Sequence, residues 1–202
     1  MYELLTDPFY EIIRQYDRCV IEYCLMKDDA PYREMQSHKE AVLFAMLRAI
    51  DRSIENTRAN EIRGGKEAAD DLCPWSYDMD MAKATPIDTA SFLHAPEILR
   101  MDRYGCTSYD CGRNSYPDNE GRIPYWYAFL KPPHGTRYKP VDFRKVNAAL
   151  FPEGTDALEA CEWTTDWSDY FDDGHEWWGA ACWSVYDARL NRYAVLFASA
   201  TD

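Results

Sequence analysis

The sequence predicts an α+β fold in which a pair of N-terminal helices packs with a C-terminal antiparallel sheet. Apolar residues recur at spacings of three and four near the N-terminus, which is typical of amphipathic helices. From residue 123 onward, aromatic and β-branched runs separated by turn residues indicate strands. Of the 202 residues, 47% are hydrophobic and 28% charged, a globular composition, and the length favours one compact domain over residues 1–202.

Three parts are expected within this domain. Residues 1–62 form the predicted helical hairpin, and residues 63–122 are rich in proline and polar residues and are predicted to be loop-rich. Residues 123–202 form the predicted sheet lobe, with the order β-α-β-β-β and about four strands.

The first predicted helix starts at a clear signal. Asp7 is a good N-cap, and Pro8 suits the first helical position because proline lacks the amide hydrogen that would have no partner there. Apolar residues continue at helical spacing as far as Cys24. The sequence therefore predicts one helix that ends near Lys27.

The second predicted helix begins at a capping-box pattern. The side chains of Ser37 and Glu40 have the spacing that satisfies two free backbone N–H groups at a helix start. The helix is expected to end before Gly64. In the following loop-rich part, the only regular element predicted is a short helix over residues 96–101.

The C-terminal part is divided by turn residues into short elements. The two last strands are joined by only five residues, which favours an antiparallel hairpin. The predicted elements are a strand at 123–130, a helix at 141–151, a strand at 158–165, one or two helical turns at 166–173, and strands at 176–186 and 192–200.

Composition also restricts the location and the partners. No segment approaches the roughly 20 apolar residues of a membrane helix, and the N-terminus has no basic segment followed by an apolar one. The seven cysteines are odd in number and scattered, which is typical of reduced thiols in a cytoplasmic protein. A net charge of −13 disfavours binding to nucleic acid. We therefore expect a cytoplasmic protein with no membrane partner.

The charge is distributed unevenly along the C-terminal half. Residues 122–145 contain six Lys and Arg residues and one acid, whereas residues 146–188 contain ten acids and no Lys or Arg. Two interpretations follow. The acids form a surface for a basic partner, or they are neutralised by the neighbouring basic segment.

Aromatic residues are interleaved with the acids after residue 160. This pattern favours a non-catalytic interaction or inhibitor module whose acidic and aromatic surface docks a basic protein, and a homodimer through the aromatic residues is an alternative. The residues expected on this surface are Asp166, Trp167, Asp169, Tyr170, Asp172, Asp173 and Glu176.

A second candidate site overlaps the first. Carboxylates and an imidazole lie within five residues at Asp172, Asp173, His175 and Glu176, and such groups bind Mg²⁺, Mn²⁺ or Zn²⁺. The alternative function is therefore a metal-assisted hydrolase. The cluster has neither the EF-hand nor the H-E-x-x-H spacing, and a turn closed by Gly174 explains it equally. Apart from such an ion, no cofactor is expected, because the sequence has no phosphate-binding glycine motif.

The basic segment contains a third candidate site. The loop over residues 131–139 carries four side chains that can attract a phosphate or an acidic peptide. These residues are Lys131, His134, Arg137 and Lys139.

Overall fold

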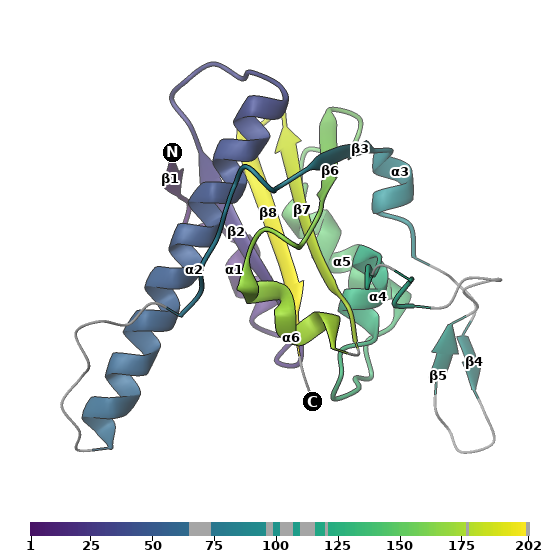
Figure 1. The fold of residues 1–202 in the computed structure, drawn as a ribbon. Helices are drawn as coiled ribbons and strands as arrows, with labels where there is room; N and C mark the ends of the chain where they lie inside the picture. The colour runs from purple at the N-terminus through teal and green to yellow at the C-terminus, as the bar shows by residue number, and fades with distance from the viewer. Residues whose placement is uncertain are drawn as a thin grey trace.

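The computed structural model describes residues 1–64, 74–95, 99–101, 107–109, 116–119, 121–176 and 178–200. These residues form a six-stranded antiparallel sheet with helices on both faces and a separate two-stranded ribbon (Figure 1). The predicted α+β class is confirmed.

In chain order, the elements are β1 (Tyr2–Glu3), α1 (Phe9–Ile13), β2 (Ile21–Lys27), α2 (Met35–Arg63), β3 (Ala84–Ile87), α3 (Thr89–Phe92), β4 (Leu99–Met101), β5 (Thr107–Tyr109), α4 (Tyr125–Leu130), α5 (Pro140–Leu150), β6 (Leu158–Trp163), the 3₁₀-helix η1 (Asp169–Phe171), α6 (Asp172–His175), β7 (Ala180–Asp187) and β8 (Arg192–Ser199).

The large sheet has the strand order β1-β2-β8-β7-β6-β3, and all of its neighbours are antiparallel. The predicted terminal hairpin is confirmed as β7 and β8, with Asp187 opposite Arg192 at the turn. Every residue of β7 is buried, because this central strand is covered on both faces. N-terminal strand β2 pairs with C-terminal strand β8, so both halves of the chain contribute to one sheet.

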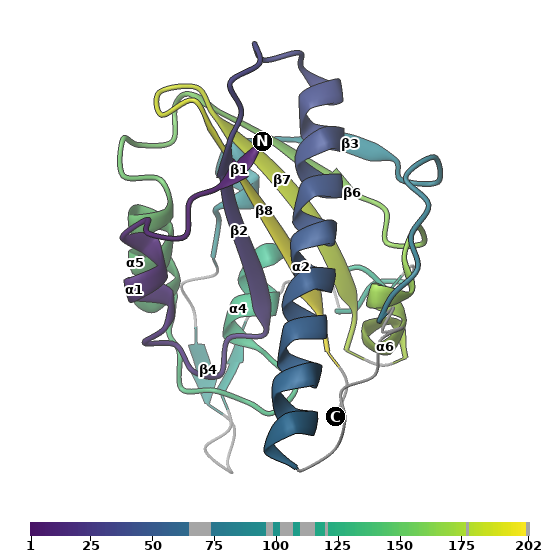
Figure 2. The same cartoon turned by 90° about the vertical axis from the view of Figure 1, so that its left-hand side faces the viewer.

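Helix α2 covers one face of the sheet. Its buried side chains include Ala41, Val42, Ala45 and Met46, which pack on the same cluster as Phe197 of β8. The small residues allow the helix to approach the sheet closely. Figures 1 and 2 show that the C-terminal half of α2 extends beyond the sheet. The helix begins at Met35, two residues before the predicted cap, and the Ser37 hydroxyl accepts the Arg33 backbone N–H at 2.9 Å.

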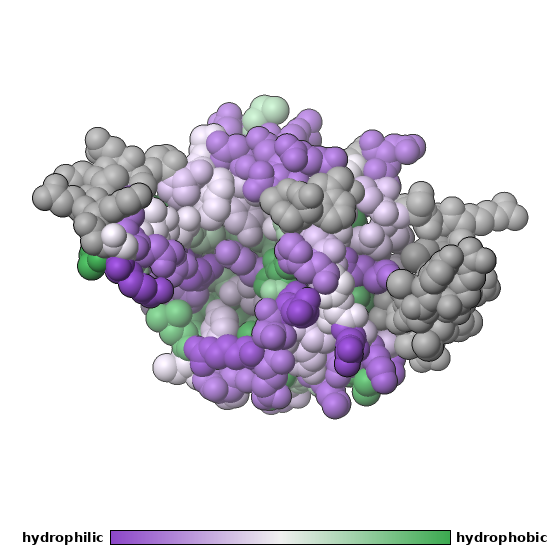
Figure 3. Space-filling model, turned by 90° about the horizontal axis from the view of Figure 1, so that it is seen from below, coloured by the Kyte–Doolittle hydropathy of each residue, from purple (hydrophilic) through white to green (hydrophobic). Residues whose placement is uncertain are grey.

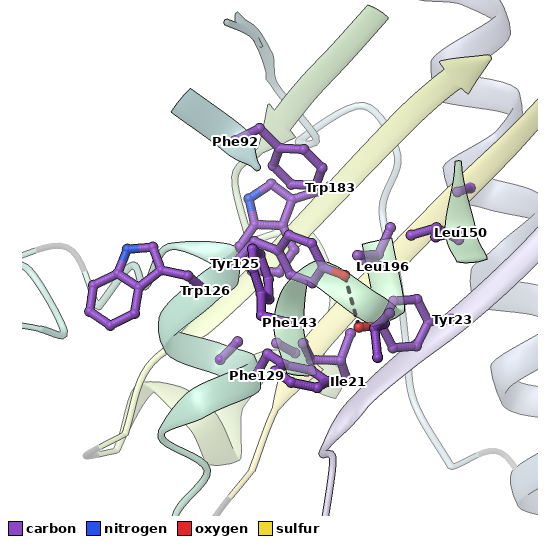
Figure 4. Close-up of a cluster of buried hydrophobic side chains, with 14 of the residues drawn as sticks. Ile21, Tyr23, Phe92, Tyr125, Trp126, Phe129, Phe143, Leu150, Trp183 and Leu196 are labelled. Atoms are coloured by element: carbon purple, nitrogen blue, oxygen red, sulfur yellow. Dashed lines mark hydrogen bonds between the residues drawn. The ribbon is translucent and has the colours of Figure 1, made fainter. Parts of the chain in front are cut away.

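Helices α1, α4 and α5 cover the other face (Figure 2). The core there is rich in aromatic residues, as Figure 4 shows, and includes Tyr125 of α4, Phe143 of α5 and Trp183 of β7. The hydroxyls of Tyr23 and Tyr125 lie 3.0 Å apart and satisfy each other in this buried setting.

The predicted first helix is wrong beyond Ile13. Helix α1 ends there, and residues 21–27 form strand β2. This strand is covered by α2 on one face and by the aromatic core on the other, so apolar residues occupy almost every position. A continuous apolar run also contains the three-and-four spacing of a helix, which is why the pattern is ambiguous. The sheet accordingly has six strands where about four were predicted.

The predicted strand at 123–130 is also wrong, because these residues form helix α4. Aromatic residues favour strands on average, but here five of the six helical residues are buried in the core. Pro124 supplies the extended residue that starts the helix. The neighbouring predictions are confirmed, since α5 and β6 lie at the expected positions.

The loop-rich part contains elements that the sequence did not predict. A short helix was expected over residues 96–101, but Leu99–Met101 is strand β4, paired with β5, and residues 96–98 lie outside the described residues. Helix α3 precedes it, capped by the Asp88 side chain, which accepts the Ser91 N–H at 2.8 Å.

A buried polar network connects α2 to the sheet. His38 is 1% exposed, and its Nδ1 lies 2.8 Å from the Ser184 hydroxyl, which also accepts the Trp163 indole N–H. Its Nε2 lies 3.2 Å from the Tyr32 hydroxyl, which donates to Glu159. One assignment satisfies every donor: Ser184 donates to Nδ1, and Nε2–H donates to Tyr32. The imidazole is therefore neutral.

Candidate functional site

The acids singled out in the sequence lie around η1 and α6, at one end of the sheet. After β6 the chain turns at Trp167, whose indole donates to the Thr164 carbonyl at 2.6 Å. The Ser168 hydroxyl then caps η1 by accepting the Tyr170 N–H. Both helices pack on β8, so one side of this segment is buried and the other faces solvent.

Two aromatic residues predicted for the surface belong to the core. Trp167 is 2% exposed and Tyr170 is 9% exposed. Their rings pack against Phe197 of β8, with centroids 6.2 and 5.5 Å away. Large aromatic side chains gain most from leaving water, so they turn inward when the segment covers the sheet. Their placement on an exposed acidic and aromatic surface is therefore corrected.

The carboxylates of the same segment remain in solvent. Asp166, Asp172, Asp173 and Glu176 are exposed, and none makes an ion pair with any residue that the structure describes. Asp169 is exposed too, and it accepts hydrogen bonds from the backbone N–H and the hydroxyl of Ser76, both at 2.8 Å.

The bond from Ser76 brings in a neighbouring segment that the sequence did not reveal. Tyr77 forms an antiparallel bridge with Ser168, and the Asp78 N–H donates to the Trp167 carbonyl at 2.7 Å. Tyr77 is 40% exposed and Met81 is 47% exposed, so apolar surface does lie beside the acids. About 90 residues separate the two segments, and no local pattern predicts such a pairing.

The exposed residues of both segments together form one acidic surface. Figure 3 views the molecule from the end where α6 lies, and hydrophilic side chains dominate this face where it is described. The acidic surface comprises Asp78, Asp166, Asp169, Asp172, Asp173 and Glu176, together with Tyr77 and Met81. Asp80 is also exposed, but it pairs with Lys39 of α2, with Nζ and Oδ1 at 3.5 Å.

Most of the basic segment lies on the opposite side of the sheet, and Arg122 is the exception, because it lines a cleft together with Glu162 and Asp166. Its helix α5 packs on the core of Tyr125 and Phe143, whereas Tyr170 and Phe171 of the acidic segment pack on the cluster beneath α2. Figure 2 shows α5 and α6 on opposite sides. Among the described residues, no ion pair joins an acid of residues 146–188 to a Lys or Arg of residues 122–145. Apart from Arg122, which lies near Glu162 and favours its ionised form, the two charge runs therefore do not neutralise each other by direct contact.

The predicted anion site is only partly assembled. Arg137 and the exposed Arg18 line a cleft of about 480 Å³ together with Asp17, and Arg18 also donates to the His134 carbonyl at 3.4 Å. Lys131 and Lys139 are not among the residues that line this cleft. Arg18 joins the loop through tertiary contact alone, so sequence reasoning missed it.

The predicted metal cluster is separated by the geometry of α6. His175 reaches back to the end of β6, where its Nε2 lies 2.7 Å from the Thr165 hydroxyl. Asp172, Asp173 and Glu176 are exposed, as is His175 itself, and only His175 is bonded to Thr165. Within the described part of the chain, no group of three His, Cys, Asp or Glu side chains is close enough to share an ion.

His175 instead lines a small polar cleft at the end of β6. The cleft also contains Glu162 and Asp166, and its volume is about 230 Å³. Burial raises the pKa of the Glu162 carboxyl, although Arg122 nearby and a hydrogen bond from the Trp183 indole act in the opposite direction. The sequence singled out His175 for a metal, but it did not reveal this neighbourhood.

The described cysteines do not provide a nucleophile. Cys19, Cys24, Cys161 and Cys182 are free thiols. Burial raises the pKa of Cys24 to about 12 and that of Cys161 to about 11, so the reactive thiolate form is scarce at neutral pH.

The chain forms an antiparallel sheet between two helical layers, with exposed acids at one end of the sheet. Comparisons with protein-family models, with curated proteins and with solved structures found no match to this chain. Among the described residues, no helix is both long enough and apolar enough to cross a membrane.

Proposed function

We propose that this protein is a non-catalytic interaction module, which docks a basic protein on its acidic surface. The observation that carries the proposal is the exposure of Asp166, Asp172, Asp173 and Glu176 without an ion pair in the described structure. Carboxylates that are held together and left without internal partners attract a positively charged surface and accelerate its approach.

The separation of charge supports the same proposal. If Lys139, Arg144 and Lys145 contacted the acids, the surface would already be neutralised. They lie on the far side of the sheet, so the acidic surface keeps its negative potential.

The exposed Tyr77 and Met81 add contact area to the charge. Tyrosine and methionine are enriched at protein interfaces because they bury large apolar area. The backbone of Tyr77 is fixed by its bridge to Ser168, so little backbone entropy would be lost when a partner binds there.

The test is a pair of triple charge reversals with equal net charge. The first is Asp172→Lys, Asp173→Lys and Glu176→Lys on the acidic surface. The control is Asp29→Lys, Glu55→Lys and Glu153→Lys, at exposed acids that make no ion pair in the described structure. Asp169 is left intact, because reversing it would break its two bonds to Ser76.

The measurement is affinity capture from a whole-cell extract at physiological salt, followed by titration of the captured partner against each variant. We expect a basic partner to bind the wild type and the control triple, and not the surface triple. Equal loss in both triples would show that only net charge matters. Retention by the surface triple would contradict the proposal as well.

Among the residues that the structure describes, no cluster of three potential metal ligands supports the metal-assisted hydrolase. Its four predicted ligands diverge, since His175 contacts Thr165 while the three acids face solvent. The interaction module is therefore the one function that we propose.

A further inference from the structure

The cleft beside His175 opens at the margin of the acidic surface. Asp166 belongs to both, which makes the two features continuous. The cleft is lined by Lys83, Thr85, Arg122, Glu162, Trp163, Thr164, Thr165, Asp166 and His175.

Glu162 is the half-buried carboxylate of this cleft. It lies on β6 directly between Thr85 of β3 and Trp183 of β7, which are its partners in the sheet. Burial raises the pKa of its carboxyl, whereas Arg122 and the Trp183 indole favour the ionised form. The backbone of Glu162 is therefore held in position between two neighbouring strands.

The imidazole of His175 forms a second wall. It is fixed by the 2.7 Å contact with the Thr165 hydroxyl and by the backbone of Gly121, where an added Cβ would lie 3.4 Å from the ring carbon Cδ2. Gly121 has φ of +75°, which a residue with a side chain rarely adopts. The imidazole thus lies beside the Gly121 backbone, although His175 as a residue is exposed.

The lining of the cleft includes two carboxylates and two cations, and Arg122 lies close enough to Glu162 to favour its ionised form. Arg122 already pairs with Asp118, with Nε and Oδ2 at 3.0 Å, and Lys83 is exposed at the margin. Glu162 and Asp166 make no ion pair with a described residue. Asp172, Asp173 and the other acids of the surface add to the negative potential at the entrance.

The volume restricts the occupant. One water molecule takes about 30 Å³ in the liquid, so 230 Å³ corresponds to roughly seven or eight waters. Pockets for drug-sized ligands and cofactors begin at about 300 Å³. The cleft therefore has room for one long side chain.

We propose that the cleft receives an arginine side chain of the basic partner, with its guanidinium group directed to Glu162 and Asp166. This inference rests on the proposed function, and it names the residue that anchors the partner. Buried arginines in central pockets are frequent energetic anchors of protein interfaces.

Arginine fits better than lysine for two reasons. Its planar group carries five donors in a fixed fork, which suits several oxygen acceptors at once, and the cleft offers carboxylates and threonine hydroxyls. It is also less strongly hydrated than an ammonium group, so entering a half-buried cleft costs less desolvation free energy.

The test uses short capped peptides that share one sequence and differ at a single central position. That position is arginine, lysine or the uncharged isostere citrulline. Binding to the full chain is followed by NMR, with Glu162→Gln as the variant. Glu159→Gln is the control, because Glu159 lies on the same strand but is exposed and accepts a bond from Tyr32. Thermal unfolding of both variants checks that they are folded.

We expect citrulline, and Glu162→Gln with the arginine peptide, each to weaken binding about tenfold or more, because a hydrogen-bonded charge is lost. Lysine should bind more weakly than arginine. The arginine peptide should also lower the pKa of the Glu162 carboxyl, because a nearby cation favours the ionised form. Glu159→Gln should bind as the wild type does.

The inference is overturned if Glu162→Gln binds the arginine peptide as tightly as the wild type, or if the citrulline peptide binds equally. Equal binding of lysine and arginine would overturn the choice of arginine. These outcomes are distinct from failure of the proposed function, which is decided by the two charge-reversal triples. If the surface triple abolishes binding of the partner while Glu162→Gln leaves binding of the arginine peptide unchanged, the docking proposal stands. Only the arginine anchor is then rejected.

Discussion

His38 makes the fold sensitive to acid. Burial lowers the pKa of this imidazole from 6.5 to about 4, and the charge of Glu159 offsets only part of that effect. Between these two pH values the unfolded chain binds a proton at residue 38 and the folded chain does not. Stability is therefore lost as the pH falls from about 6.5 toward 4.

The magnitude follows from the size of the pKa change. A difference of about 2.5 pKa units corresponds to about 3 kcal/mol of unfolding free energy when the loss is complete. Between about pH 7.5 and pH 5 the same linkage gives about 2 kcal/mol. A loss of that size is a large fraction of the stability of an ordinary domain.

The assay is urea unfolding of the wild type and of His38→Gln at about pH 7.5 and pH 5. The variant should be less stable at the higher pH, because it lacks the buried imidazole. Since glutamine cannot titrate, the variant should also lack the contribution of residue 38 to the acid-induced loss of stability. The many carboxylates also titrate toward the lower pH, and their effect is common to both proteins and cancels in the difference. His134→Gln is the control, because its side chain is exposed, and it should behave as the wild type.

The expected difference between the wild-type and His38→Gln losses is about 2 kcal/mol. The reasoning is refuted if both proteins lose the same stability between the two pH values. Equal losses would mean that His38 is charged in the native state, or that it is accessible to water in a way its 1% exposure does not allow.

Two further predictions concern a tightly packed glycine and a buried ion pair. Gly174→Ala should destabilise the fold by about 1–3 kcal/mol, because the added Cβ would lie 2.5 Å from the Gly179 carbonyl oxygen. The matched control in urea unfolding is Gly64→Ala, whose added Cβ would have contacts of 3.4 Å. Equal effects of the two substitutions would contradict this reason. Asp7→Asn should lower the free energy of unfolding by about 3–5 kcal/mol, because Arg192, which is 4% exposed, would lose its carboxylate partner at 2.5 Å. The double variant Asp7→Leu with Arg192→Leu should recover part of the stability, because it leaves no buried charge unpaired. A double variant less stable than Asp7→Asn would contradict the argument.

The sequence predicted an element correctly where its pattern of apolar and polar residues, or a short turn beside it, is a local property of that segment. Helix α5 and the hairpin of β7 and β8 were predicted because amphipathic spacing and a short turn are local properties. The strand β2 and the helix α4 were missed for the opposite reason. Both are buried on most sides, so their sequences carry no alternation that distinguishes a strand from a helix.

The candidate site could be predicted only in part. The exposed carboxylates were identified because charge is visible in a sequence. The inward rotation of Trp167 and Tyr170, and the arrival of Tyr77 beside them, depend on which side of the segment meets β8. Glu162 was counted among the acids, and its place in a cleft between three strands required the pairing of β3 with β6.

The location of the charges shows most clearly why proximity along the chain can mislead. Residues 122–145 and 146–188 are adjacent in sequence, and adjacency favoured mutual neutralisation. However, α5 lies on one face of the sheet, β6 is a strand within it, and η1 returns on the other face. A sheet and the layer packed on it are about 10 Å apart, which exceeds the screening length of about 8 Å at physiological salt. Opposite charges placed on the two sides cannot pair directly, and in the basic segment the exception is Arg122, which lies beside Glu162 at the end of β6.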